Sequence, residues 1–245
     1  SVSPSAPKRI MSLALGAISG LFVGVVLALA FAFSRGVHYS KKSLINGAQA
    51  RFNASVRTLT PMRNRSLNDI KAILLAKSLP VLRDLTVEIH KSAATQVVVT
   101  STRAKLTGND TARALASYMH SDTMKIAIID FSQKSKKPHV DPETISIGSF
   151  VTVESVGQIS VLTPFGDLAA IELIMQRDFV KNLQSLNSTF DLIFMCADNG
   201  DAVGLLSALE GQKAFHITLA RTKHTKSDAL SHLRSLFPIQ GLLHD

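Results

Sequence analysis

The chain has 245 residues, a formal net charge of +9 and a single cysteine. One cysteine excludes a disulfide framework as the source of stability, and the eight scattered histidines show no spacing typical of a metal site. The length is sufficient for one sizeable domain together with additional segments.

Residues 1–9 contain Pro4 and Pro7 and precede an uncharged run of 24 residues, Ile10–Phe33. At about 1.5 Å per residue this run would extend about 36 Å as a helix, which exceeds the hydrocarbon thickness of about 30 Å. We therefore predict a transmembrane helix over residues 10–33. A cleaved secretory signal is the alternative, but its apolar core is usually about half as long.

Three glycines, Gly16, Gly20 and Gly24, recur at intervals of four in the predicted span. This spacing places them on one helix face, where a second helix could approach closely. Glycine is also common in membrane helices in general, so both interpretations stay open.

The flanking charges predict the orientation of the span. Residues 35–65 carry seven Lys or Arg and no acidic residue, whereas only Lys8 and Arg9 precede the span. The excess of basic residues predicts that the C-terminal portion is cytoplasmic. A lone Cys196 agrees with a reducing compartment.

Residues 34–94 are expected to form a basic connector with short helices. An amphipathic stretch at residues 67–77 predicts one such helix, and Pro61 and Pro80 interrupt the pattern around it. Residues 35–137 contain 18 basic and 6 acidic residues, against 7 and 12 in residues 138–245. We expect the basic half to contact anionic lipid headgroups. We expect no nucleic acid partner, because aromatic residues that could stack on bases are not interleaved with the charges.

Residues 95–245 alternate short apolar runs with helical patterns, which predicts an α/β domain with a doubly wound, mainly parallel sheet. Its ligand crevice should lie beyond the carboxyl ends of the strands. The predicted strands are Gln96–Thr100, Lys125–Asp130, Gln158–Leu162, Phe190–Met195 and Ala214–Ala220. The predicted helices are Asn109–His120, Leu168–Leu186, Asp201–Leu209 and Ser227–Leu236.

A strand, a loop with one glycine and a helix follow one another in VVVTSTRAKLTGNDTARALA, residues 97–116. A phosphate loop requires a Lys for the terminal phosphates and a Ser or Thr for magnesium. Here Asn109 and Asp110 follow Gly108, and a carboxylate at a helix N-terminus repels phosphate. We interpret both residues as helix-capping rather than catalytic groups.

With these motifs in order, the chain resembles the C-terminal part of a bacterial exopolysaccharide transport protein, of the polysaccharide co-polymerase (chain-length determinant) family. In that family a Pro-containing periplasmic segment leads through a transmembrane helix to a cytoplasmic tyrosine kinase domain of the P-loop NTPase type. Residues 97–116 resemble its Walker A region, IAIIDFSQKSKKP at 126–138 its second Walker motif, and FDLIFMCADNGDA at 190–202 its Walker B region.

The departures from this pattern lie where catalysis would reside. Asn109 stands at the Walker A Lys position, Asp110 at the following hydroxyl position, Ser132 at the second Asp of the second motif, and Cys196 at the Walker B Asp. Three acidic positions persist, namely Asp130, Asp191 and Asp201. The tyrosine-rich tail of such kinases has no counterpart after Tyr118, and Tyr39 is expected to anchor at the membrane interface.

We interpret the loop as a vestigial phosphate site with no assigned catalytic residue and no cofactor. Its members are Thr102, Arg103, Lys105, Thr107, Gly108, Asn109, Asp110 and Thr111. Two alternatives remain: Lys105 and Thr111 could replace the missing groups, and Asp130 is either a weak metal ligand or a polar strand end. Cys196 is expected to be a buried thiol rather than a nucleophile.

The resemblance implies an oligomeric subunit of the bacterial inner membrane that supports polymerisation or export of a surface exopolysaccharide, together with polymerase and export components. In this hypothesis the nucleotide-binding fold is a pseudokinase retained for assembly or regulation. The first alternative is an active tyrosine autokinase that uses ATP and magnesium. The second is a membrane-tethered scaffold that recruits another protein.

Overall fold

The computed structural model describes residues 9–34, 36–37, 40–76, 79–102, 107–131, 146–147, 150–164, 174, 178–198 and 200–244. The chain divides into two compact units, residues 1–37 and 38–245, and each is described by itself.

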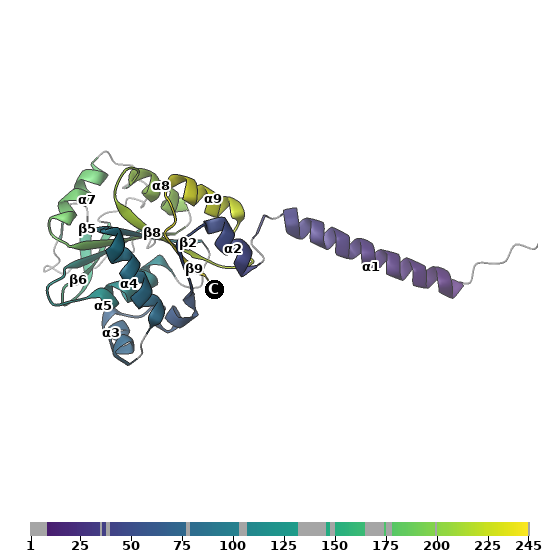
Figure 1. The fold of residues 1–245 in the computed structure, drawn as a ribbon, viewed down its shortest axis with the longest axis horizontal. Coiled ribbons are helices and arrows are strands. Elements are labelled where there is room, and N and C mark those ends of the chain that lie inside the picture. The colour runs from purple at the N-terminus through teal and green to yellow at the C-terminus, as the bar shows by residue number, and fades with distance from the viewer. Residues whose placement is uncertain are drawn as a thin grey trace, which may run out of the picture. The chain divides into compact units, whose positions relative to one another are not determined.

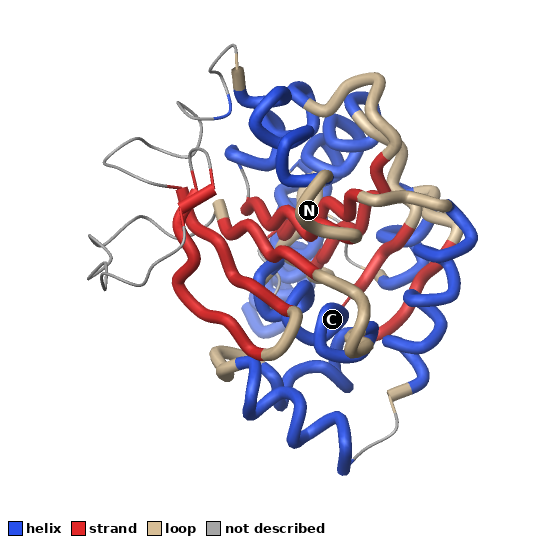
Figure 2. Tube along the Cα trace, turned by 90° about the vertical axis from the view of Figure 1, so that its left-hand side faces the viewer, coloured by secondary structure: helices blue, strands red, loops and turns tan. Residues whose placement is uncertain are grey.

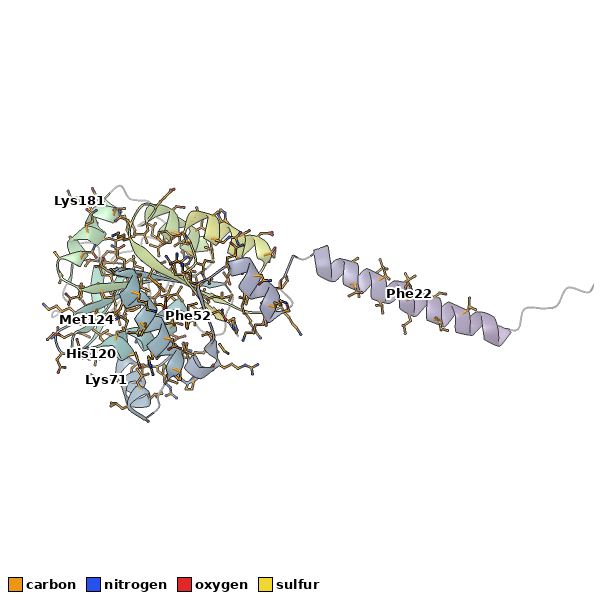
Figure 3. The ribbon with its side chains drawn as sticks, in the orientation of Figure 1. Phe22, Phe52, Lys71, His120, Met124 and Lys181 are labelled. Carbon is orange, nitrogen blue, oxygen red and sulfur yellow. The ribbon has the colours of Figure 1, made fainter. Side chains whose placement is uncertain are left out.

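The first unit contains one helix, α1 (Arg9–Ser34), of 26 residues. Large apolar side chains are exposed along it, among them Leu21, Phe22 and Leu27, and Phe22 projects from the helix in Figure 3. In the part of the chain that the structure describes, no helix satisfies the combined length and apolarity of a membrane span.

The second unit is built on one sheet, which has nine strands among the described residues, in the order β1-β9-β8-β2-β7-β3-β6-β5-β4. Neighbouring strands are parallel from β1 through to β6, while β5 and β4 add antiparallel pairings at one edge. The strands are β1 (Phe52–Ser55), β2 (Gln96–Thr102), β3 (Ile126–Asp130), β4 (Ser146–Ile147), β5 (Phe150–Val156), β6 (Ile159–Pro164), β7 (Leu192–Asp198), β8 (Ala214–Ala220) and β9 (Gly241–His244).

Helices cover both faces of this sheet (Figures 1 and 2). Helices α3 (Leu67–Ala76), α4 (Pro80–Ser92) and α5 (Gly108–Met119), with the 3-10 helix η1 (Val56–Met62), bury apolar side chains on one face. Helices α7 (Phe179–Asn187), α8 (Gly200–Ala208) and α9 (Ser227–Leu236) do so on the other. Successive residues of β2 alternate between the two cores, with Val97 and Val99 in the first and Val98 in the second. Alternation of this kind is why a strand buried on both faces appears as a continuous apolar run in the sequence.

The five predicted strands and three of the four predicted helices after Gly108 agree with expectation, apart from shifts of up to three residues at their ends. Of the predicted helix at 168–186, only its C-terminal part, within α7, is described with clear helical bounds, and most of residues 168–177 lie outside the described residues. The sequence did not indicate β1, β4, β5 or β9. The mainly parallel α/β class is confirmed.

The segment 34–94, expected to be a connector, contributes β1, η1, α3 and α4 to the second unit, which begins at His38. The predicted helix at 67–77 is present as α3. The segment packs onto the domain because its apolar side chains, including Leu59, Met62 and Leu82, are fully buried in the first core. A further short helix, α2 (Lys41–Ala48), packs beside α9 through a separate cluster that contains Leu44, Leu230 and Ala220.

Candidate functional site

The N-terminus of α5 lies against the carboxyl-terminal half of β2, at the position that the sequence indicates for a phosphate loop. A Cβ atom added to Gly108 would lie 2.8 Å from the carbonyl oxygen of Val99 and 3.5 Å from Cβ of Cys196. Because real Cβ atoms do not approach a backbone oxygen this closely, only glycine permits the helix to start here. The glycine of the motif therefore has a packing role that does not depend on any ligand.

Thr107 and Asp110 close the start of α5 with a reciprocal capping box. The Thr107 hydroxyl accepts a hydrogen bond from the Asp110 backbone N–H at 3.1 Å, and Oδ2 of Asp110 accepts from the Thr107 N–H and hydroxyl at 3.2 and 2.9 Å. A carboxylate at N3 is stabilised by the unpaired N–H groups and the helix dipole. The expected capping role of Asp110 is confirmed.

Asn109 has a different role from the capping role expected for it. Its side-chain oxygen accepts a hydrogen bond from Nε of Arg113 at 3.1 Å, one helical turn further on. Thr107 is the N-cap residue instead. Thr111 donates its hydroxyl to the Thr107 carbonyl at 3.3 Å, so it also points back along the helix.

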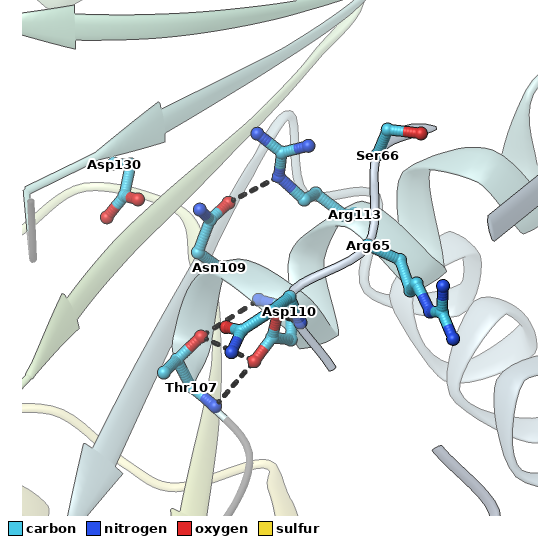
Figure 4. A pocket seen from close by; sticks show the side chains of 8 residues that line it. Arg65, Ser66, Thr107, Asn109, Asp110, Arg113 and Asp130 are labelled. Atoms are coloured by element: carbon cyan, nitrogen blue, oxygen red, sulfur yellow. Dashed lines mark hydrogen bonds between the residues drawn. The ribbon is translucent and has the colours of Figure 1, made fainter. Parts of the chain in front are cut away.

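The second oxygen of the Asp110 carboxylate bonds to a distant part of the chain. Oδ1 accepts from the backbone N–H of Asn64 at 2.8 Å, and Asn64 has a left-handed φ of 54°. The loop between η1 and α3 thereby forms one wall of a cavity of about 460 Å³. The lining residues, shown in Figure 4, are Asn64, Arg65, Ser66, Thr107, Asn109, Asp110, Arg113 and Asp130.

A second set of contacts ties the same loop to α5. Arg113 forms an ion pair with Oε2 of Glu154 on β5, and the exposed fractions of the two side chains are 12% and 26%. Oε1 of Glu154 accepts from the backbone N–H of Leu67, the first residue of α3, at 2.9 Å. Glu154 therefore links the start of α3 to α5 across the cavity wall.

Two carboxylates lie where β3 and β7 end. Asp130 pairs in register with Cys196, two residues before Asp198. Burial, followed by the charge of Asp130, raises the pKa of Asp198 from 3.8 to about 6, although a hydrogen bond from the Gly108 backbone opposes the shift. Burial also raises the pKa of the Cys196 thiol well above its ordinary value, with the Asp130 charge as the next cause. Cys196 is fully buried, which confirms that its thiol is buried as expected.

The structure brings together four of the predicted site residues around the cavity, namely Thr107, Asn109, Asp110 and Asp130. Thr102 is turned toward β8 instead, because its hydroxyl donates to the Leu219 carbonyl at 3.0 Å. Arg103, Lys105, Ser132 and Tyr39 lie outside the described residues. Within the described residues, no cluster of three or more His, Cys, Asp or Glu side chains is arranged to hold a metal ion.

Sequence reasoning missed five residues of this site: Asn64, Arg65, Ser66, Arg113 and Asp198. Arg113 had a usable signal, since it follows Asn109 by four positions and therefore shares its helix face. Asp198 had one as well, because it ends a buried strand parallel to the strand that ends in Asp130. The loop at 64–66 had none, because its contact depends on the tertiary fold.

No family model matches the chain, and no curated protein matches it. Solved structures are similar to it in fold. The BceF tyrosine kinase domain matches with a TM-score of 0.59 and 14% identity over 85% of this chain and 98% of that one. The kinase domain of Escherichia coli tyrosine kinase ETK matches with a TM-score of 0.55 and 15% identity over 82% of this chain and 91% of that one. The chimerical protein CapA2B2 matches with a TM-score of 0.51 and 15% identity over 84% of this chain and 98% of that one. The second unit thus has the fold of bacterial tyrosine kinase domains.

Proposed function

We propose that this chain is a membrane-anchored, oligomeric subunit that supports polymerisation or export of a surface exopolysaccharide in a bacterial inner membrane, with the α/β domain on the cytoplasmic side. We further propose that this domain retains a kinase fold for assembly or regulation and does not transfer phosphate. The fold likeness to the BceF and ETK tyrosine kinase domains supports the first part, together with the ordered motif resemblance along the chain.

The observation that carries the loss of catalysis is the occupation of the α5 N-terminus by the chain itself. A phosphate loop offers free N–H groups to an anion. Here the Asp110 carboxylate accepts hydrogen bonds from the Thr107 and Asn64 backbones. A phosphate at the same place would meet a fixed negative charge about one hydrogen-bond length away. The Asp110 carboxylate at this helix start opposes a magnesium-bound triphosphate, and phosphoryl transfer depends on positioning and charge neutralisation.

The membrane anchor is supported by the uncharged run at residues 10–33 and by the apolar side chains exposed along α1. The excess of basic residues after this run supports a cytoplasmic domain. The glycines at 16, 20 and 24 have no heavy atom within 4 Å of an added Cβ, so this face is open to a second helix of an oligomer.

Calorimetric titration of the purified full chain in detergent with ATP and magnesium tests the loss of nucleotide binding. We expect no binding heat up to millimolar ATP, while circular dichroism shows a folded protein. Binding at micromolar ATP that requires magnesium would contradict the proposal and would direct mutagenesis to Lys105, Thr111 and Asp130. The double substitution Asn109→Lys/Asp110→Ser serves as a companion, because it restores the missing cation and removes the opposing charge.

Gene replacement in the source bacterium tests the role in export. We expect deletion of the chain to abolish surface polysaccharide, and a chain with Lys105→Ala and Asp130→Ala to restore it. Restoration by the natural chain but not by this variant, with both present at equal amounts, would favour the active kinase.

A further inference from the structure

A short basic segment interrupts the acidic half of the chain. Three of the seven Lys and Arg residues after position 137 fall within the six residues 221–226, RTKHTK, which also contain His224. This segment joins β8 to α9, so it lies where β8 ends at the carboxyl edge of the sheet.

Thr225 fixes this segment as a defined turn and directs its charges outward. The Thr225 side chain is buried, where its hydroxyl donates to the Thr102 carbonyl at 3.1 Å and accepts from the Arg221 N–H at 2.9 Å. The N–H of Thr225 also bonds to the Arg221 carbonyl at 2.9 Å. Lys223, His224 and Lys226 are exposed around this buried anchor.

Lys223 adopts a left-handed conformation with a φ of 65°, which favours glycine or asparagine over a residue with a long side chain. The turn therefore carries a lysine at a position where glycine would fit with less strain.

Helix α2 brings a second pair of lysines to the same edge. Arg234 on α9 donates to the Gly47 carbonyl on α2 at 3.1 Å, and Leu230 and Leu44, about one turn earlier on each helix, belong to one apolar cluster with Ala220. The two helices thus run side by side in the same direction. Their first residues lie beside the end of β8, with Lys41 and Lys42 exposed.

We infer that Lys41, Lys42, Lys223 and Lys226 form one docking surface for the anionic phospholipid headgroups of the bilayer that holds α1. The inference deepens the proposed function and rests on its membrane anchor. Six residues, 35–40, separate α1 from α2. When fully extended they reach about 20 Å, so Lys41 cannot move far from the end of the anchor. Lysines this close to an anionic leaflet are attracted to it. The one acidic residue in the first turn of α9, Asp228, offsets a single charge.

The test uses the full chain reconstituted in nanodiscs of phosphatidylcholine alone or mixed with phosphatidylglycerol. A fluorophore is attached through Ser227→Cys, beside the surface, or through Ser121→Cys, which precedes β3 at the opposite edge of the parallel sheet. The native Cys196 is fully buried and stays unlabelled. Headgroup spin-labelled lipids then report by quenching which edge lies at the membrane.

We expect the docked population measured at Ser227→Cys to rise at least about fivefold with phosphatidylglycerol, since one lysine near an anionic surface contributes about that factor. The label at Ser121→Cys should not respond. Replacing Lys41, Lys42, Lys223 and Lys226 with Gln, or adding 0.5 M salt, should remove the increase. A matched control replaces four other exposed basic residues, Arg83, Lys125, Lys181 and Lys213, with Gln and should leave it intact; Lys181 lies on α7 in Figure 3.

Equal quenching at Ser227→Cys in both lipid mixtures would overturn the inference. The inference would also be overturned if the surface variant and the control variant lost the phosphatidylglycerol-dependent increase equally, since the increase would then depend on net charge alone. Failure of the chain to enter nanodiscs at all would instead refute the proposed anchor, and the inference with it, so the two failures are distinguishable.

Discussion

The backbone N–H of Asn64 donates to Oδ1 of Asp110 over 2.8 Å, although 46 positions separate the two residues in the chain. The other carboxylate oxygen caps the helix that Asp110 itself begins. One side chain thus performs a local task and a long-range task. Its position at the start of α5 links this helix directly to the loop between η1 and α3.

Asp110→Ala removes both the helix cap and the hydrogen bond from Asn64. We expect the free energy of unfolding to fall by about 2 to 3 kcal/mol, since an N-terminal cap contributes about 1 kcal/mol and a hydrogen bond to a charged group about 1.5 or more. Urea denaturation of the full chain in detergent measures the change. Asp69→Ala, in the exposed first turn of α3, is the matched control and should change stability by less than about 0.5 kcal/mol. Equal effects of the two substitutions would refute this assignment.

Gly108→Ala tests the close approach of α5 to β2. The new methyl group would lie 2.8 Å from the Val99 carbonyl oxygen, which is backbone and cannot rotate away. We expect a loss of about 1 to 3 kcal/mol from overpacking, in contrast to the gain that alanine normally brings inside a helix. Thermal unfolding followed by circular dichroism gives the sign, and a stabilised variant would show that the contact is mispositioned.

The ion pair between Arg113 and Glu154 connects α5 to the residue that also bonds to the start of α3, so its removal tests how the segment before residue 94 is attached to the domain. A double-mutant cycle with Arg113→Met and Glu154→Gln isolates the interaction. We expect a coupling free energy of about 1 kcal/mol, above that of an exposed pair, because both side chains are mostly buried. Glu154→Ala, which removes the acceptor, should also increase hydrogen exchange at the Leu67 amide, whose N–H donates to Oε1 of Glu154. Unchanged exchange there would contradict the proposed link.

Asp198 should make stability depend on pH in an unusual direction. Its folded-state pKa is raised from 3.8 to about 6, so the folded protein holds the proton more tightly than the unfolded chain. The stability that this proton contributes is present below about pH 4 and is lost as the pH rises through 6. Asp198→Asn should therefore stabilise the protein at pH 7.5 and have little effect at pH 4. Urea midpoints across this range provide the measurement, with the exposed Asp228→Asn as the control; parallel profiles for natural chain and Asp198→Asn would refute the assignment.

The sequence alone predicted the centre of the sheet because strands such as β2 and β8 are buried on both faces and appear as unbroken apolar runs. It did not predict β1, whose four residues FNAS become a strand only by pairing with β9. The strand β5, next to the edge strand β4, was missed although half-buried and exposed residues alternate over Thr152–Val156.

In the candidate site, too, the locally determined features were predictable from the sequence and the long-range contacts were not. Asp110 was predicted as a capping residue because local chemistry at a helix start determines that role. The hydrogen bond from Asn64 to Asp110 was not predictable, since no sequence pattern around either residue indicates that the two are close in the fold. Contacts between distant segments are set by how both pack on the shared core, as the burial of Leu59 and Met62 illustrates.

The parallel pairing of β1 with β9 has a consequence for synthesis on the ribosome. β1 lies near the beginning of the second unit, whereas its partner, residues 241–244, is the last strand described. At about 5 to 20 residues per second, roughly 10 to 40 s pass between the emergence of the two. During that interval the segment around Phe52 has no partner strand, while the helix that precedes it has already left the ribosome. If α1 is the membrane anchor proposed above, its early capture by the insertion machinery would hold the nascent chain at the membrane until the final strand completes the sheet.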